Sequence, residues 1–343
     1  MEISEHYKNK SILVTGGAGS IGSELVKKLL TLNVKTLRIF DNNETALFNL
    51  GNELQSDSIR LFVGDIKDKE RLTRAFEGID IVFHAAALKH VPLCEYNPFD
   101  AVKTNIIGTQ NVLNVALDEE IEKLITISTD KAVNPSNVMG ATKLLAERLT
   151  LSANYYKGNR KTVLSCVRFG NVLGSRGSVI PVFQQQIKKG LPLTVTDPKM
   201  TRFIMTIPKA IDLILRAGNI AQHGEIFILK MPSIRIMDLA KVMIDTLGPK
   251  YNYKLDTSKI TIIQKRAGEK LHEELMGQNE SDYVFENNDM FIIYPNYLRI
   301  NDTFEIPAGF KRTRKTYYSS RDEDFLSENK IASLINQIFS SSY

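Results

Sequence analysis

Lys10-Ser-Ile-Leu-Val-Thr-Gly-Gly-Ala-Gly-Ser-Ile-Gly22 joins a short apolar strand to the start of a helical pattern. Gly16, Gly19 and Gly22 give the spacing GxxGxxG. In such a loop the glycines allow a tight turn, close approach of the backbone to a pyrophosphate, and close helix–strand contact. The helix that follows would point free N–H groups at the phosphates. The stretch therefore predicts a dinucleotide site, contacted by Gly16, Ala18, Gly19, Ser20, Ile21 and Gly22.

Alternation of strands and helices continues through the first half of the chain. Strands are predicted at residues 10–15, 35–40, 61–63, 79–84, 124–128 and 163–169, and helices at 22–32, 98–117 and 137–156. This alternation indicates an α/β fold, a doubly wound parallel Rossmann sheet with helices on both faces.

The pattern loosens after about residue 175, where prolines interrupt it. Helices are still predicted at 179–189, 207–221 and 236–247, and strands and turns in the C-terminal part, for instance at 290–294. We expect residues 1–175 to form an NAD(P)-binding domain to which later segments return. Residues 176–343 should form mainly a smaller, intertwined substrate-binding lobe with a C-terminal extension.

Composition excludes several classes of protein. The 343 residues are 43% apolar and 24% charged, and the net charge of +5 is scattered. This distribution argues against nucleic-acid binding, and a modest positive bias suits an anionic substrate such as a nucleoside diphosphate. The two cysteines and five histidines show no metal-ligand spacing. Without a signal peptide or a long apolar stretch, we expect a cytoplasmic enzyme with no membrane contact and no metal.

Asp41 closes the second predicted strand, 19 residues after Gly22. A carboxylate there accepts hydrogen bonds from ribose hydroxyls and repels a 2′-phosphate. Asn42 follows it, and no Arg or Lys occurs at 42–44, so NAD is favoured while NADP stays open. Asp65 and Ile66 are predicted to border the adenine, and Asp65 also to cap a helix from residue 67 onward.

A second motif, Ser128-Thr-Asp-Lys-Ala132, follows a strongly apolar strand, and Met139 stands four residues before Lys143. Together with GxxGxxG, His84-Ala-Ala-Ala87 and Lys103-Thr-Asn105, it resembles the extended short-chain dehydrogenase/reductase family. Within that family the chain is similar to the UDP-N-acetylglucosamine 4,6-dehydratases of bacterial and archaeal glycan synthesis. The stretches that carry this closer similarity are residues 85–92, 128–143, 168–181, 197–203 and 266–271.

The resemblance implies a reaction on UDP-N-acetylglucosamine with NAD or NADP tightly bound and recycled. The C4 hydroxyl is oxidised by hydride transfer, a base removes the C5 proton, an acid protonates the departing C6 hydroxyl, and the hydride returns to C6. The product is a UDP-4-keto-6-deoxy-N-acetylhexosamine for surface glycans, with the C5 configuration left open. The resemblance assigns Lys131 as the base and Asp130 as the acid. Burial and the cofactor's charge should lower the pKa of Lys131.

Met139 occupies the position at which most relatives carry tyrosine, and its thioether cannot take a proton. A subset of 4,6-dehydratases is similar in having Met-xxx-Lys. Lys143 should hold the nicotinamide ribose, as the family lysine does. Removal of the C4 hydroxyl proton is then expected to fall to Thr129, acting with Asp130 or with a water.

The resemblance also implies a wider set of contacts and a homo-oligomer, dimeric or hexameric by family analogy. A 4-epimerase remains a rival interpretation, although it would need the tyrosine and no Asp-Lys pair. An inactive NAD-binding protein is the other. For each arginine below, a surface ion pair is the competing interpretation. The implied cofactor contacts are Ala85, Ala86, Lys89 and Asn105, and the loop and substrate contacts are Lys89, His90, Asn171, Ser175, Arg176, Ser178, Val179, Thr196, Arg202, Arg266 and Glu269.

Overall fold

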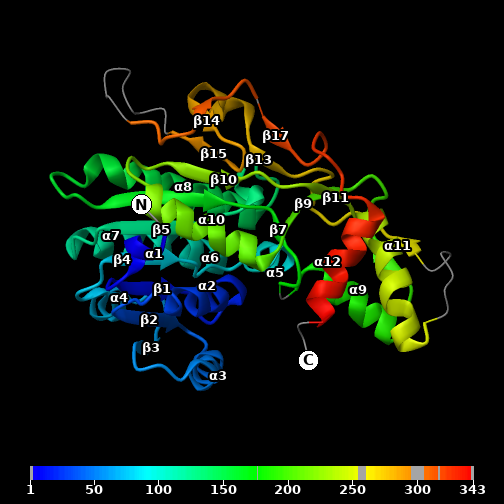
Figure 1. Cartoon of the computed structure of the whole chain (residues 1–343), viewed down its shortest axis with the longest axis horizontal. Coiled ribbons are helices and arrows are strands. Elements are labelled where there is room, and N and C mark those ends of the chain that lie inside the picture. Colours follow the sequence, from blue (N-terminus) through cyan, green and yellow to red (C-terminus); the bar gives the residue numbers. More distant parts are fainter. Residues whose placement is uncertain (1–2, 176, 254–259, 295–304, 316, 341–343) are drawn as a thin grey trace.

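A ten-stranded sheet forms the centre of the protein (Figure 1). The computed structural model describes residues 3–175, 177–253, 260–294, 305–315 and 317–340. In spatial order the strands are β16 (Lys311–Arg312), β14 (Val284–Glu286), β15 (Met290–Ile293), β10 (Ile226–Leu229), β6 (Val163–Arg168), β5 (Lys123–Ile127), β4 (Ile81–His84), β1 (Ser11–Thr15), β2 (Thr36–Asp41) and β3 (Ile59–Val63).

The strands from β10 to β3 run parallel. The other three pairs are antiparallel: β15 with β10, β14 with β15, and β16 with β14. Chain order reverses at β1, since β2 and β3 lie on one side of it and β4, β5 and β6 on the other. Open parallel sheets bind ligands at the carboxyl ends of the strands at such a reversal. Thr15 ends β1 opposite Phe40 and His84, which places the glycine-rich loop at that crevice.

Helices cover both faces of the sheet (Figure 1). Ile12 and Val14 lie in one buried cluster with α2 and α10, whereas Leu13 lies in another with α4 and α7, because alternate strand side chains point to opposite faces. The doubly wound sheet predicted from the sequence is confirmed. The helices around the sheet are α1 (Ile3–Tyr7), α2 (Ser20–Leu30), α3 (Glu44–Leu54), α4 (Lys69–Phe76), α5 (Val91–Tyr96), α6 (Pro98–Ala101), α7 (Thr109–Asp118), α8 (Val138–Tyr156) and α10 (Ile207–Ile220).

A second lobe has its own buried cluster between α9, α11 and α12, on the right of Figure 1. Small sheets lie outside the central one: β7–β9–β11, β8–β12 and β13–β17. The helices of the second lobe are α9 (Val179–Lys188), α11 (Ile236–Leu247), η3 (Gly248–Tyr251) and α12 (Glu328–Ser340), whereas η5 (Gln278–Tyr283) packs against β15 of the central sheet. The strands of the small sheets are β7 (Asn171–Val172), β8 (Leu193–Val195), β9 (Thr201–Met205), β11 (Ser233–Arg235), β12 (Ile260–Ile262), β13 (Glu274–Met276) and β17 (Tyr318–Ser319).

The helix predicted at 98–117 differs in the structure, because a π-helical segment, η1 (Val102–Gly108), separates α6 from α7. Asn105 lies inside it and reaches the loop after β4: its Oδ1 accepts from Leu88 N at 2.8 Å and its Nδ2 donates to Leu88 O at 3.0 Å. Helices α1, α3, α5 and α12 were not predicted, whereas α4 corresponds to the helix predicted from residue 67 onward. The prediction of only strands and turns near the C-terminus was therefore wrong for α12.

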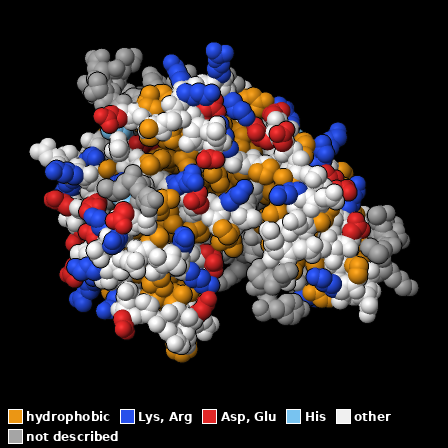
Figure 2. Space-filling model, viewed as in Figure 1, with side chains coloured by type: hydrophobic (Ala, Val, Ile, Leu, Met, Phe, Trp, Pro, Cys, Tyr) orange, Lys and Arg blue, Asp and Glu red, His pale blue; other side chains and the backbone are white. Residues whose placement is uncertain are grey.

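The surface carries charges of both signs. Figure 2 shows Lys and Arg interspersed with Asp and Glu on the face in view, with hydrophobic side chains between them. Among the helices of the described residues, none combines the length and apolar character needed to span a bilayer.

Candidate active site

Two adjoining cavities lie at the carboxyl edge of the parallel strands. The first, of about 560 Å³, runs from the glycine-rich loop to Lys131. The second, of about 1160 Å³, continues from Lys131 toward α9 and β9 of the second lobe. Because both are lined by Lys131, a ligand could reach from one to the other past this side chain. Lys89, His90, Lys131, Asn171, Ser175 and Ser178 line both cavities.

Nearly all predicted contact residues line one cavity or the other. Arg176 lies outside the described residues. Asn105, predicted as a cofactor contact, lies behind the loop that follows β4 and lines neither cavity. The first cavity is lined by Gly16, Ala18, Gly19, Ser20, Ile21, Gly22, Asp41, Asn42, Asp65, Ile66, Ala85, Ala86, Lys89, Thr129, Met139 and Lys143. The second is lined by Lys89, His90, Asn171, Ser175, Ser178, Val179, Thr196, Arg202, Arg266 and Glu269.

The glycine-rich loop has the shape that a pyrophosphate requires. Gly16 has φ +67°, and a Cβ there would lie 2.6 Å from Ala86 N. A Cβ on Gly22 would lie 2.2 Å from Gly16 O, so this glycine brings α2 against the loop. Gly19 caps α2 without a side-chain hydrogen bond. The first N–H groups of α2 therefore face the cavity with their positive dipole end, which suits an anion.

Asp41 stands at the far end of the first cavity. Its Oδ2 accepts from Ala18 N and its Oδ1 from Asn43 N, both at 3.0 Å. The described cations that line this cavity are Lys89, Lys131 and Lys143, all at its opposite end. Asp41 is thus fixed by the backbone with no cation beside it in the lining, which suits ribose hydroxyls better than a 2′-phosphate.

Asp65 does not cap α4, contrary to the prediction. Its Oδ1 accepts from Lys67 N at 2.9 Å, in a turn before the helix, while Asp68 is the N-cap and accepts from Arg71 N at 3.0 Å. Asp65 is therefore placed along the cavity wall beside Ile66, where the adenine contact was predicted.

Two residues of α8 form the wall at the catalytic end. Lys143 is buried and its Nζ donates to Ile127 O at 2.6 Å, and burial lowers its pKa. Met139 packs in a small apolar cluster with Cys94 and Ala101. The tyrosine position thus offers only a buried thioether, and no proton acceptor, to the cavity.

Asp130 and Lys131 form a 3₁₀ turn, η2 (Asp130–Ala132), directly after β5. Thr129 Oγ1 donates to Asp130 Oδ1 at 2.7 Å, and Lys131 Nζ lies 2.9 Å from the same oxygen. Asp130 is fully buried and lines neither cavity. Thr129 and Lys131, which do line the first cavity, therefore separate the Asp130 carboxylate from a ligand.

The predicted lowering of the Lys131 pKa is wrong. Burial does lower this pKa, but the attraction of Asp130 and Glu273 outweighs it, and the net shift is upward. Lys131 is therefore an ammonium ion at neutral pH in this structure. The sequence showed the burial but not the second carboxylate.

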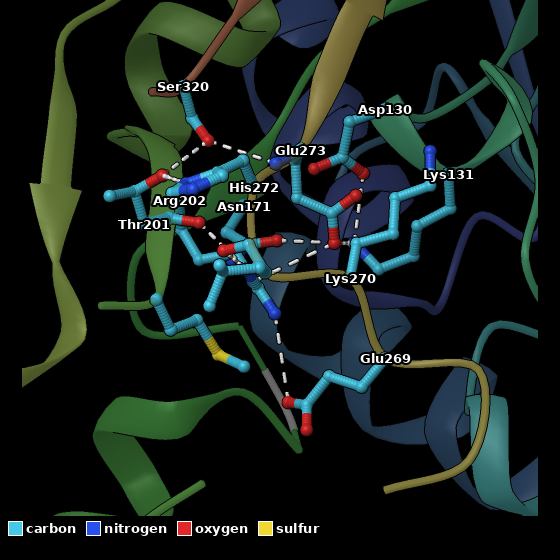
Figure 3. A network of polar contacts seen from close by, with 12 residues as sticks. Asp130, Lys131, Asn171, Thr201, Arg202, Glu269, Lys270, His272, Glu273 and Ser320 are labelled. Carbon is cyan, nitrogen blue, oxygen red and sulfur yellow. Dashed lines mark hydrogen bonds and ion pairs between the residues drawn. The ribbon is translucent and has the colours of Figure 1, made fainter. Parts of the chain in front are cut away.

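Glu273 is a buried carboxylate beside Lys131 that the sequence analysis did not single out. Its Oε1 lies 3.5 Å from Lys131 Nζ and 3.7 Å from Arg202 Nε (Figure 3). The carboxylate is 3% exposed, and burial, partly opposed by Lys131, raises its pKa. It follows the predicted 266–271 block by two residues, but Glu274 beside it is an identical residue type. Nothing in one sequence tells which of the two points inward.

The arginines predicted as phosphate clamps differ in availability. Arg202 is buried and its Nη1 donates to Thr201 O at 2.7 Å, while its Nη2 lies 3.7 Å from Glu269 Oε1. Arg266 is exposed, and its backbone N donates to Glu269 at 3.3 Å. Arg266 thus keeps a more accessible guanidinium than Arg202 for an anionic ligand in the second cavity.

No three His, Cys, Asp or Glu side chains in the described part of the chain gather as metal ligands. The site is a set of proton donors and acceptors beside a dinucleotide-shaped groove. Such a site can combine hydride transfer with proton transfer.

Comparisons with known proteins agree with this geometry. Residues 12–295 match the family described as polysaccharide biosynthesis protein. An uncharacterized membrane protein of Methanocaldococcus jannaschii is 60% identical over 98% of each chain. The inverting UDP-N-acetylglucosamine 4,6-dehydratase of Campylobacter jejuni is 38% identical over 96% of this chain and 98% of its own length.

Two further similarities bear on the reaction. A protein of Rickettsia canadensis named UDP-glucose 4-epimerase is 38% identical over 84% of this chain and 83% of its own. The X-ray structure of Pen from Bacillus thuringiensis superposes with a TM-score of 0.89 at 44% identity, covering 96% of this chain and 98% of that one. The similar proteins therefore include both dehydratases and epimerases of sugar nucleotides.

Proposed function

The chain belongs to the polysaccharide biosynthesis protein family, and within it we propose that the chain is a UDP-N-acetylglucosamine 4,6-dehydratase. The observation that carries the proposal is the Asp130–Lys131 pair beside Thr129 at the catalytic end of the first cavity. Elimination of water needs a base and an acid beyond the groups that a hydride transfer needs. A 4-epimerase removes no water, so it needs no acid to protonate a leaving hydroxyl.

The dinucleotide groove is proposed to hold NAD, with its pyrophosphate at the N-terminus of α2 and its adenosine ribose at Asp41. Lys143 would hold the nicotinamide ribose, which the lining of the first cavity supports. When bound, NAD accepts a hydride from the sugar C4 and returns it to C6. The UDP moiety would lie in the second cavity, toward Arg266 and α9.

Thr129 is the proposed route for the C4 hydroxyl proton. Its Oγ1 already donates to Asp130 Oδ1, so it can accept from the sugar hydroxyl while passing its own proton to the carboxylate. Asp130 then holds the proton that the departing C6 hydroxyl needs and returns it through Thr129, because Asp130 itself lines neither cavity. Lys131, as a neutral amine, removes the proton of C5.

The test is incubation of the purified protein with UDP-N-acetylglucosamine, followed by mass spectrometry of the sugar nucleotide. Loss of one water supports the proposal, whereas an unchanged mass with a new C4 configuration supports an epimerase. No turnover at all supports an inactive NAD-binding protein. Proton NMR of the product reports the configuration at C5.

Lys131→Ala should remove most of the water loss, because Lys131 is the proposed base for the C5 proton, while the affinity for NAD is preserved. General-base removal typically costs about 10²- to 10⁴-fold in rate. Lys161→Ala, at an exposed lysine, is the matched control and should retain activity. Water loss at an undiminished rate in the Lys131 variant would refute the assignment.

A further inference from the structure

Three ionisable groups from two distant parts of the chain meet at the junction of the cavities (Figure 3). Asp130 and Lys131 come from η2, and Glu273 comes from the residue before β13. Lys131 Nζ lies 2.9 Å from Asp130 Oδ1 and 3.5 Å from Glu273 Oε1. Glu273 is in turn fixed through its backbone, since its N–H donates to Ser320 Oγ at 2.9 Å.

If the chain has the proposed function, Lys131 carries one proton too many to act as the base. Between two carboxylates Lys131 is held as an ammonium ion, and an ammonium ion cannot accept the C5 proton. Asp130 is the nearer carboxylate, but in the proposed reaction it receives the proton of the C4 hydroxyl. Some other group must take a proton from Lys131 before elimination.

We propose that Glu273 is this acceptor, taking one proton from the Lys131 ammonium before elimination and returning it after the reaction. The residue acts through Lys131 and makes no bond with the sugar in this role. Glu273 is therefore a positioning residue, additional to the Asp130–Lys131 pair, that sets the protonation state of Lys131.

The protons balance over the cycle. Oxidation at C4 leaves its hydroxyl proton on Asp130, and Glu273 takes a proton from Lys131 to give a neutral amine. The amine takes the C5 proton, and the C5–H electron pair forms the C5–C6 double bond. The C6–O bond breaks as Thr129 Oγ1 gives its proton to the leaving hydroxyl, forming water, and Asp130 returns its proton to Thr129. After C6 has been reduced, Lys131 can return its proton to C5 on its own face, and the Glu273 carboxyl then reprotonates the amine.

The surroundings of Glu273 support this role. Its Oε2 is buried with no hydrogen-bond partner among the described residues, which leaves an oxygen ready to carry a proton. Burial raises its pKa toward that of an acceptor. The charged groups that face it are Lys131 and Asp130 from η2, Arg202 from β9 and Lys270 from its own segment. Its ion pairs with Lys131 and Arg202 are long, with N–O distances of 3.5 Å and 3.7 Å.

The experiment measures the pH dependence of water loss in Glu273→Gln, in which shape is kept and proton acceptance is lost. Near pH 7 water loss should fall by about 10²-fold or more. It should recover roughly tenfold per pH unit as the pH rises, because solvent must then deprotonate Lys131. The wild type should show no such rise. Reduced nicotinamide, followed by its absorbance in a single turnover, should still form in the variant, since oxidation at C4 precedes the affected step.

Two further variants control for shape and fold. Glu273→Asp keeps a carboxylate, so its water loss should stay independent of pH even where the rate is lower. Glu274→Gln makes the same change at the neighbouring half-buried residue, which accepts from Asn134 Nδ2, and should behave as the wild type. Thermal unfolding of each variant reports whether the fold is retained.

Three results would overturn the proposal. If Glu273→Gln loses water at the wild-type rate or faster, with its optimum moved to lower pH, then Glu273 only keeps Lys131 charged. If both Glu273 variants also fail to form reduced nicotinamide, the residue orients the sugar or supports the fold. In both cases the wild type still loses water, so the proposed function stands. If the wild type itself releases no water, the proposed function fails and this proposal with it.

Discussion

Glu280→Gln tests whether a buried charge network holds the segment that carries Glu273. Arg168 of β6 is fully buried between two carboxylates. Its Nε and Nη2 donate to Glu147 of α8 at 2.7 and 2.6 Å, and its Nη1 and Nη2 donate to Glu280 of η5 at 2.8 and 2.7 Å. Glu280 also accepts from Gly277 N at 3.0 Å, so it ties the turn after β13 to the central sheet.

The magnitude follows from what the glutamine keeps and loses. A hydrogen bond to a charged group contributes about 1.5–3 kcal/mol, and glutamine retains one acceptor oxygen of the two. Arg168 keeps its bidentate pair with Glu147, so the cost stays below the roughly 3–5 kcal/mol of a wholly unpaired buried charge. We expect Glu280→Gln to lower the free energy of unfolding by about 2–3 kcal/mol near pH 7.

The pKa of Glu280 predicts how the effect of the substitution on stability changes with pH. Burial raises the pKa of Glu280, but Arg168 and the Gly277 N–H outweigh it and hold the pKa below its ordinary value. A carboxyl with a lowered folded-state pKa stabilises the fold above its unfolded pKa, roughly 4.3, and loses that contribution as the pH falls through the folded value. The difference between wild type and variant should therefore shrink below about pH 4.

Urea unfolding followed by circular dichroism, at about pH 7 and at several lower values, measures both quantities. Glu24→Gln is the control, because Glu24 forms an exposed ion pair with Lys27 at 3.0 Å and should change stability by no more than about 0.5 kcal/mol. A Glu280→Gln effect as small as the control, or one that stays constant with pH, would refute the reasoning.

Two other predictions concern the dinucleotide groove. Gly22→Ala should lower the melting temperature and cost about 1–3 kcal/mol or more, because the new Cβ would meet Gly16 O at 2.2 Å and Gly17 Cα at 2.7 Å, both backbone atoms. Gly51→Ala, whose Cβ would meet only the end of the Leu61 side chain, should be tolerated when both are compared by calorimetry with and without NAD. Asp41→Asn should raise the affinity for NADP relative to NAD by about tenfold or more, because it removes the charge that repels a 2′-phosphate. Fluorescence titration with both dinucleotides measures the ratio, and an unchanged ratio would exclude Asp41 as the selecting group.

The elements that sequence predicted correctly are those whose signals are local. The β1 strand, the glycine loop and α2 are contiguous, and their apolar period and glycine spacing are visible without tertiary contacts. Helix α12 carries a similar signal in Ile331 and Ile335, four residues apart and both buried against the second lobe. It was missed because the polar residues around it suggested turns. The apolar period gives no sign of the π-helical turn at Asn105, whose side chain hydrogen-bonds to Leu88 across the fold.

The candidate site likewise combines residues whose contact is visible in the sequence with a contact that only the fold creates. Thr129, Asp130 and Lys131 are consecutive, so their meeting is visible in the sequence. The contact of Lys131 with Glu273 depends on how the segment before β13 returns to η2, which only the folded chain shows. The pKa of Lys131 was predicted with the wrong sign for this reason. Burial can be read from an apolar strand, whereas the balance between burial and attraction depends on every carboxylate within a few ångströms.

Met139, at the position where the resemblance implies a tyrosine, determines which groups remain to move protons. In the first cavity this position presents a thioether packed against Cys94 and Ala101. Under the proposed function, the proton of the sugar hydroxyl must therefore leave by another path. The donors and acceptors that remain are in sequence: Thr129 Oγ1 is 2.7 Å from Asp130 Oδ1, which is 2.9 Å from Lys131 Nζ.

Glu273 extends that path by one further contact, 3.5 Å from Lys131 Nζ. Asp130 Oδ2 and Glu273 Oε2 are both buried and unpartnered among the described residues, so each carboxylate keeps one oxygen for a proton. With a carboxylate on each side of Lys131, Asp130 can receive the C4 proton and Glu273 can receive a proton from the Lys131 ammonium. In the proposed reaction Asp130 takes the C4 proton that a tyrosine at position 139 would take. Glu273 then accepts the Lys131 proton that Asp130 can no longer accept, so the roles of Met139 and Glu273 are linked.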